Sequence, residues 1–367
     1  MTVIADEHEA HGATFEERGG RRVVTDYGRP ERTHRAVRNG AGVVEMGYGV
    51  VLVEGDDRHE FVDNAVTNHV PTEEGEGSYA LLLDPQGRVE TDMYLYEAGE
   101  RLLLFTPPDR AEPLVEDWSE KTFIQDVELT DASSDFGVFG VHGPKSTEKV
   151  ASVLHNASVP EEPLSFVRGA TADVGITVMA TDAPTGEEGY EVVCAAEDAA
   201  AVFDSLIARG LNAPPFGYRT WETLTLEAGT PLFDSELAGR LPNVVGLRNA
   251  LDFDKGCYVG QEVVSKVENQ GRPSRRLVGL RPESVPEPNA PVLDADGDAV
   301  GTVTRAADCP SLEGPAALAL VDFDAAEGHA FTVGAGVGAE VDAERADLPF
   351  YEGSMRSARL PSYVVVD

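Results

Sequence analysis

Short apolar runs alternate with stretches of helical periodicity along most of the chain. The strand-like run 49–53 precedes the segment 61–66, in which apolar residues recur at helical spacing. Three further apolar runs, at 79–83, 93–96 and 101–105, are separated by turn-forming segments that contain glycine. This pattern predicts a strand, a helix and then a β-meander.

Residues 1–40 are polar and predict an irregular lead-in with one short helix. Segments after residue 105 repeat the mixture of strands and helices. Helical stripes and strand-like runs follow one another at 111–118, 136–141, 144–154, 176–180, 190–194 and 202–207. Strands therefore come in pairs between helices rather than in strict βαβ alternation. The predicted fold class is α+β.

The composition changes near residue 272, where proline, glutamate and arginine become frequent and helical periodicity ends. Short strand-like runs follow at 278–280, 300–304, 317–321 and 363–366. We therefore predict a first domain over residues 1–274 and a separate β-barrel domain over residues 275–367.

The chain is strongly acidic, with 29 Lys+Arg against 65 Asp+Glu and a formal net charge of −36 over 367 residues. The acidic residues are dispersed rather than gathered in a block, which indicates a surface adapted to high salt, as in a halophile. An acidic interaction tail would need a contiguous run of like charge. So large an excess of negative charge also argues against a nucleic-acid partner.

The cysteines Cys194, Cys257 and Cys309 are odd in number and widely spaced, which disfavours both a disulfide framework and a zinc site. A reducing cytoplasm is the expected location. The N-terminus lacks an export signal, and no apolar run is long enough to span a membrane. His8 and His11 could share a helix face, but one such pair is weak evidence, so we predict no metal site.

The segment 254–262 stands out because it combines two glycines, a thiol and a lysine without a clear helix or strand period, which predicts a loop. Lys255 lies two residues from Cys257, and an ammonium can stabilise a thiolate. The alternative is a glycine-bounded turn with a buried cysteine. A cationic island, defined as Lys255, Lys266, Arg272, Arg275 and Arg276, contrasts with the acidic chain.

Three carboxylates lie in apolar surroundings. Asp92 and Glu191 fall within strand-like runs, where a buried carboxylate needs a polar partner. The alternative for Asp92 is a strand-end residue that faces water. Glu227 ends a helix before Gly229, which favours a structural role.

The run Lys255-Gly256-Cys257-Tyr258-x-Gly260-Gln261-Glu262 resembles the signature of YgfZ-type folate-binding proteins, which are relatives of the glycine cleavage T-protein. Matching segments extend over roughly residues 40–360. The resemblance implies a T-protein-like fold of two intertwined α+β subdomains with a C-terminal β-barrel, built around a tetrahydrofolate site.

The resemblance also implies roles for individual residues. Asp92 falls on the carboxylate near the reactive folate nitrogens, Glu191 on the one that holds the pterin, and Tyr79 on a residue that could pack on the pterin ring. The cationic island could receive the anionic glutamate tail of folate. Trp221 replaces an arginine that T-proteins usually carry, and Arg219 could compensate for it. Thr91-Asp92 also departs from the T-protein pattern of consecutive aspartates, and both changes bear on glycine-cleavage turnover rather than on pterin binding.

Three functions follow from the resemblance. A YgfZ-type protein would bind folate and support iron–sulfur enzymes, with Cys257 as the functional thiol and Lys255 as its modulator. An aminomethyltransferase would instead move a one-carbon group from a lipoyl carrier protein to tetrahydrofolate. A non-catalytic adaptor would have lost folate, which the presence of both Asp92 and Glu191 disfavours.

Overall fold

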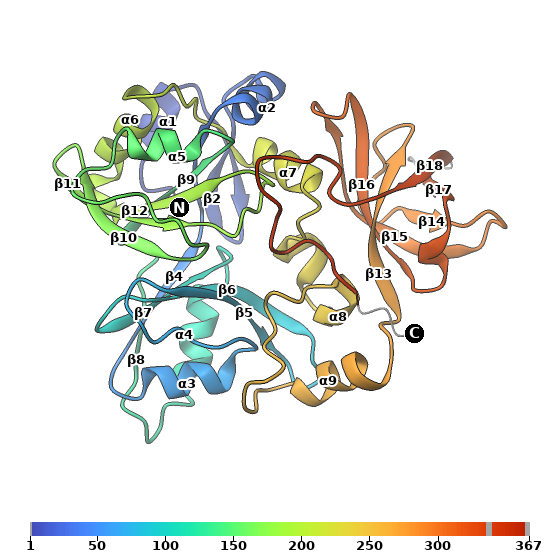
Figure 1. The fold of residues 1–367 in the computed structure, drawn as a ribbon, viewed down its shortest axis with the longest axis horizontal. Coiled ribbons are helices and arrows are strands. Elements are labelled where there is room, and N and C mark those ends of the chain that lie inside the picture. The colour runs from blue at the N-terminus through green and yellow to red at the C-terminus, as the bar shows by residue number, and fades with distance from the viewer. Residues whose placement is uncertain (1, 335–339, 364–367) are drawn as a thin grey trace.

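The computed structural model describes residues 2–334 and 340–363. Its described part forms two α+β lobes and a β-barrel, arranged around the central helices α7 (Tyr218–Glu227) and α8 (Pro242–Val245) (Figure 1). The strand predicted at 363–366 lies outside the described residues beyond Tyr363.

One lobe is built on an antiparallel sheet in the order β5-β6-β7-β4-β8. The strands are β4 (Gly49–Glu54), β5 (Gly77–Leu83), β6 (Val89–Glu97), β7 (Arg101–Thr106) and β8 (Glu128–Asp131). Helices α3 (Arg58–Ala65) and α4 (Ala111–Ser119) contribute Phe61, Val62, Leu114 and Trp118 to a core against this sheet. The predicted strand, helix and meander are therefore present.

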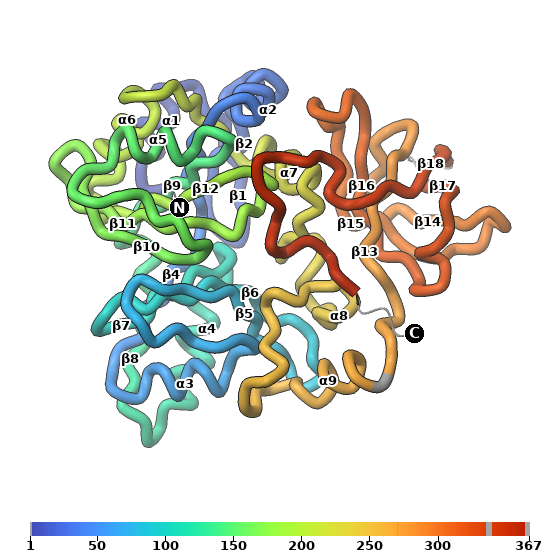
Figure 2. The backbone as a smooth tube through the Cα atoms, viewed as in Figure 1, coloured from blue at the N-terminus to red at the C-terminus, as the bar shows by residue number. Residues whose placement is uncertain are grey.

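The other lobe contains the sheet β10-β11-β12-β9-β3, formed by β3 (Gly42–Glu45), β9 (Phe136–His142), β10 (Phe166–Thr171), β11 (Val174–Ala180) and β12 (Gly189–Ala195). Helices α1 (Ala5–Ala10), α5 (Ser146–Ala151) and α6 (Ala199–Ala208) accompany it. The chain crosses between the lobes after β3 and again after β8, so the two sheets are intertwined (Figure 2). Apolar side chains from both lobes share a core between them.

Two local predictions are wrong. Residues 1–40 contain α1, the hairpin β1 (Thr14–Arg18) and β2 (Arg21–Asp26), and α2 (Pro30–Asn39), rather than an irregular lead-in. The segment 254–262 is also not a loop throughout, because α9 (Gln261–Gln270) begins directly after Gly260. Gly260 has φ +80°, a left-handed conformation that turns the chain into the helix.

The barrel is closed in the order β13-β16-β15-β14-β17-β18. Its strands are β13 (Arg275–Pro282), β14 (Pro291–Leu293), β15 (Ala299–Cys309), β16 (Gly314–Asp322), β17 (Ala330–Gly334) and β18 (Glu340–Ala346). The chain then leaves the barrel and runs back along the lobe that contains β11 and β12, where the amides of Met355 and Ala358 donate to the carbonyl oxygens of Gly186 and Asp182 (Figure 1). This return carries C-terminal side chains into the centre of the molecule.

Candidate active site

A cleft opens where the two lobes meet α7. Aromatic side chains and a few charged groups line it: Arg18, Tyr48, Asp92, Tyr94, Phe105, Tyr218, Trp221, Glu222, Phe233, Asp234 and Arg359. Segments far apart in the sequence therefore build one site.

Asp92 lies on β6 and is only 8% exposed. Its Oδ2 atom accepts a hydrogen bond of 2.7 Å from the Tyr79 hydroxyl, whereas its buried Oδ1 atom has no partner. Burial raises the pKa of Asp92, although Tyr79 and Arg359 oppose this shift. The site therefore holds a carboxylate oxygen that is available to a ligand.

Glu191 lies on β12 and is 7% exposed. It lines a smaller cavity beside the cleft, and Tyr48, Tyr94 and Phe105 line both. Its Oε1 atom accepts a hydrogen bond of 3.4 Å from the Tyr48 hydroxyl, and its buried Oε2 atom has no partner. Burial raises the pKa of Glu191 to about 8.

Arg359 is the buried cation of the cleft, and the sequence pattern did not single it out. Its Nε atom lies 2.9 Å from Asp182 Oδ2, and its Nη2 atom donates to the Tyr94 hydroxyl at 2.8 Å. Its guanidinium also lies over the ring of Tyr79, 5.0 Å from the centroid. Arg359 thus fixes two aromatic residues next to Asp92.

Two family models match the chain, the GCVT N-terminal domain over residues 4–255 and the glycine cleavage T-protein C-terminal barrel domain over residues 275–352. The chain belongs to the glycine cleavage T-protein family. The predicted T-protein-like α+β fold with a C-terminal barrel is therefore confirmed.

Relatives of this family match along nearly the whole chain. The aminomethyltransferase of Saccharopolyspora erythraea is 33% identical over 363 residues, which cover 96% of this chain and 98% of the relative. The aminomethyltransferase of Geobacillus kaustophilus is 31% identical over 326 residues, which cover 86% of this chain and 88% of the relative. The crystal structure of the glycine cleavage system aminomethyltransferase T from Bartonella henselae has a TM-score of 0.85 at 21% identity, covering 96% of this chain and 98% of that chain. These names favour the aminomethyltransferase alternative over the YgfZ-type prediction.

The T-protein fold does not bring every predicted residue to the cleft. Tyr79 is 1% exposed and does not line the cleft, because Arg359 covers its ring; it positions Asp92 instead of offering a stacking face. Arg219 is exposed on α7 and is not among the residues that line the cleft, whereas Tyr218 and Trp221 turn toward it. That Arg219 replaces the usual T-protein arginine stays a prediction.

The Lys255 side chain is 5% exposed and holds the end of α3. Its ammonium donates to the carbonyl oxygens of Asp63, Val66 and Asn68 at 2.7 to 2.9 Å and lies 3.0 Å from Asp63 Oδ1. None of these partners is Cys257, which is exposed. The role of Lys255 as thiol modulator stays a prediction, while its contacts are those of a structural residue.

The cationic island is dispersed in the T-protein fold. Arg272, Arg275 and Arg276 form ion pairs with the barrel residues Asp324, Asp322 and Glu327. No residue of the cationic island lines the cleft, so the structure does not support its predicted contact with a folate tail. Within the described lining of the cleft, Arg18 is the cation besides Arg359, and Glu222 already pairs with it at 2.7 Å.

Glu227 is fully buried and accepts hydrogen bonds from His34 and Arg38, which agrees with a structural role. Within the described residues, no helix has the length and apolar character needed to cross a membrane.

Proposed function

We propose that this protein transfers a one-carbon group to tetrahydrofolate, as an aminomethyltransferase that receives its group from a lipoyl carrier protein. Aminomethyltransferases of this family use tetrahydrofolate. One observation carries the proposal: Asp92 and Glu191 are buried at the same aromatic wall, and each has one oxygen without a partner. A buried acceptor without a donor is costly in a folded protein.

The donors of a pterin fit Glu191. A pterin presents a 2-amino group beside a ring N–H, and one carboxylate can accept both. Glu191 has the free Oε2 atom and only a long hydrogen bond at Oε1. Because its pKa is about 8, the side chain is protonated at neutral pH without ligand, and accepting two donors would favour the ionised form.

Asp92 would serve the reacting nitrogen. Tetrahydrofolate, when bound, supplies the nucleophilic nitrogen of the transfer. An Asp92 carboxylate that faces this nitrogen can accept its proton and stabilise the positive charge of the transition state. The Tyr79 hydrogen bond holds Oδ2 in place, so Oδ1 is the oxygen left to perform this step.

Cys257 supports a second candidate, a YgfZ-type role in iron–sulfur enzyme maintenance. Its thiol is exposed, while Cys194 and Cys309 are buried. The exposed position within the Lys-Gly-Cys-Tyr segment would let the thiol meet a partner protein. In a transferase, by contrast, the folate nitrogen and the carrier supply the reacting atoms, and the thiol has no step to perform.

The test compares both functions in one purified protein. Tetrahydrofolate binding is measured by calorimetry, and transfer from an aminomethyl-loaded lipoyl carrier is measured by formation of methylenetetrahydrofolate. We expect Glu191→Gln to weaken binding, Asp92→Asn to stop transfer while binding persists, and the surface control Glu112→Gln to match the wild type. Wild-type protein that binds tetrahydrofolate but transfers nothing, with iron–sulfur enzyme activity dependent on Cys257 in cells, would establish the second candidate instead.

A further inference from the structure

The charged residues that line the cleft fall into a buried group and an exposed group. Asp92 and Arg359 are 8% and 5% exposed and form the inner group. The side chains of Arg18 and Glu222 are 23% and 40% exposed, and Asp234 is exposed as well. Because solvent reaches the second group, Arg18, Glu222 and Asp234 mark the mouth of the cleft.

Acidic side chains already engage the cation at the mouth. The Arg18 Nη2 atom lies 2.7 Å from Glu222 Oε1, and the Arg18 Nε atom donates to the Glu16 carboxylate. The Arg18 guanidinium also lies over the Tyr218 ring, 4.6 Å from the centroid. A ligand carboxylate that approached Arg18 would therefore meet two protein carboxylates at the same guanidinium.

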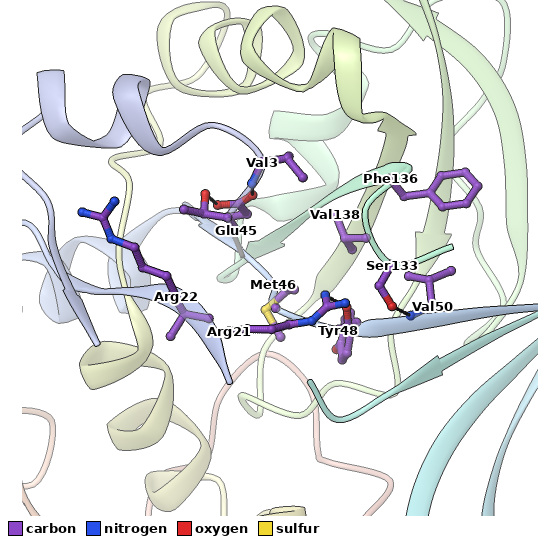
Figure 3. Close-up of a pocket in the computed structure, with 13 residues that line it drawn as sticks. Val3, Arg21, Arg22, Glu45, Met46, Tyr48, Val50, Ser133, Phe136 and Val138 are labelled. Carbon is purple, nitrogen blue, oxygen red and sulfur yellow. Dashed lines mark hydrogen bonds between the residues drawn. The ribbon is translucent and has the colours of Figure 1, made fainter. Parts of the chain in front are cut away.

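Two further arginines lie close to the cleft, but neither is among the described residues that line it. Arg110 lies over the Phe233 ring, 5.0 Å from the centroid, and its Nε atom is 3.4 Å from Asp109 Oδ1. Arg21 lines a separate small pocket, where it donates to the Tyr48 carbonyl oxygen at 2.6 Å (Figure 3). Both cations are thus engaged by other parts of the chain.

The mouth carries an excess of negative charge. Burial raises the pKa of Asp234, and the nearby carboxylates of Asp109 and Glu222 add to the rise, while Arg18 and Arg110 oppose it. These groups are therefore near enough to act on one another. Four carboxylates face two guanidinium groups there, namely Glu16, Asp109, Glu222 and Asp234 against Arg18 and Arg110. A negatively charged ligand group at the mouth would be repelled.

We propose that the cleft selects its tetrahydropterin by the charge of the tail and takes forms whose tail is short and weakly anionic. This inference rests on the proposed function, which places the pterin at Glu191 and the reacting nitrogen at Asp92. The tail then leads from Asp92 to the mouth. In a folate this tail is a p-aminobenzoyl ring followed by one glutamate or a chain of γ-linked glutamates, and each added glutamate carries one more negative charge.

The lining of the cleft suits the ring of this tail better than its glutamates. Trp221 is 5% exposed and immediately precedes Glu222 on α7, and Tyr218 and Phe233 also line the cleft. These aromatic side chains can pack on a p-aminobenzoyl ring. Beyond the ring, the glutamates would lie beside Glu222 and Asp234, where like charges repel. Contacts with the ring therefore favour binding, while each added carboxylate opposes it.

The test compares three ligands that differ in the tail alone: tetrahydropteroate, tetrahydrofolate and its tri-γ-glutamate form. Calorimetry measures the Kd of each at about 0.15 M and about 1 M salt, where the Debye length falls from about 8 Å to about 3 Å. At the lower salt we expect tetrahydropteroate to bind at least as tightly as tetrahydrofolate, and the triglutamate to bind roughly tenfold more weakly. At the higher salt this difference should shrink to about twofold or less, because the repulsion is screened.

A double variant, Glu222→Gln with Asp234→Asn, removes two carboxylates from the mouth. It should bind the triglutamate at least as tightly as tetrahydrofolate, while its Kd for tetrahydropteroate stays at the wild-type value and shows that the site is intact. The matched control is Glu287→Gln with Asp296→Asn, which removes two exposed carboxylates from the barrel and should keep the wild-type order of affinities.

Two results would overturn the inference and leave the proposed function standing. One is a wild-type Kd that falls as glutamates are added, and the other is an order of affinities that the double variant at the mouth leaves unchanged. Failure of the wild type to bind any of the three ligands at about 1 M salt would instead overturn the proposed function, and the inference with it.

Discussion

Replacing Glu191 by glutamine should stabilise the ligand-free protein and weaken folate binding at the same time. Burial raises the pKa of Glu191 from an ordinary 4.5 to about 8. A carboxyl group of this kind favours the folded state below pH 4.5, and that contribution is lost as the pH rises toward 8, because the unfolded chain ionises first. Glutamine has no proton to lose.

The magnitude follows from the shift. Each pH unit corresponds to about 1.4 kcal/mol, so over the interval from 4.5 to 7 the wild type loses about 3 kcal/mol that the variant keeps. Urea unfolding at pH 5, 6, 7 and 8 in constant salt measures the difference. We expect the two proteins to agree within about 1 kcal/mol at pH 5 and to diverge steadily above it.

Folate binding should move in the opposite direction. The glutamine amide replaces an acceptor oxygen by a donor, so it should cost about 1–3 kcal/mol of tetrahydrofolate affinity. Glu112→Gln, an exposed position, controls for the loss of one negative charge and should show no pH-dependent gain. A stability difference between the Glu191 variant and the wild type that is flat from pH 5 to 8 would refute the argument from burial.

Four further predictions concern other parts of the molecule. Asp92→Asn should lower kcat for one-carbon transfer by about 10²–10⁴-fold and change the Kd for tetrahydrofolate little; a parallel loss of both would remove Asp92 from the chemistry. Iodoacetamide should modify Cys257 first, because burial raises the pKa of both other thiols to about 12; equal rates by mass spectrometry would contradict this. Lys255→Met should lower the free energy of unfolding by about 1–3 kcal/mol, because three carbonyl oxygens lose their donor; denaturant titration checks it. The dispersed negative charge should lower the Tm as salt is reduced from molar to low concentration, and a flat Tm would exclude a high-salt adaptation.

Much of the fold was predictable because local signals agree with it. The runs at 79–83, 93–96 and 101–105 became β5, β6 and β7, since their apolar residues and turn segments already favour a meander. The N-terminal hairpin was missed for a physical reason. Strands β1 and β2 have few buried residues, so their sequence lacks the alternation that predicts a strand.

The two carboxylates were predictable because each lies among apolar strand residues, where an acidic side chain needs an explanation. Arg359 was not predictable, because its role in the site depends on contacts with Asp182 and Tyr94 that form only when the chain returns from the barrel. Tyr48 was also missed, since an isolated tyrosine between two strands resembles any core aromatic residue. Both depend on contacts between distant segments, which periodicity does not report.

The charges of the site explain the unusual behaviour of its carboxyl groups. Asp92, Asp182 and Glu191 surround one buried cation, Arg359, and Asp182 takes its ion pair. Burial raises the pKa values of the other two carboxyl groups, and the hydrogen bond from Tyr48 that opposes this shift at Glu191 is a weak one of 3.4 Å. A ligand that brings two hydrogen-bond donors to Glu191 stabilises its ionised form, which Arg359 does not do because it pairs with Asp182. Below pH 8, binding of this ligand therefore releases a proton from Glu191. Affinity for the pterin should then rise with pH over the same interval in which the ligand-free fold loses stability, because both trends have one carboxyl group as their origin.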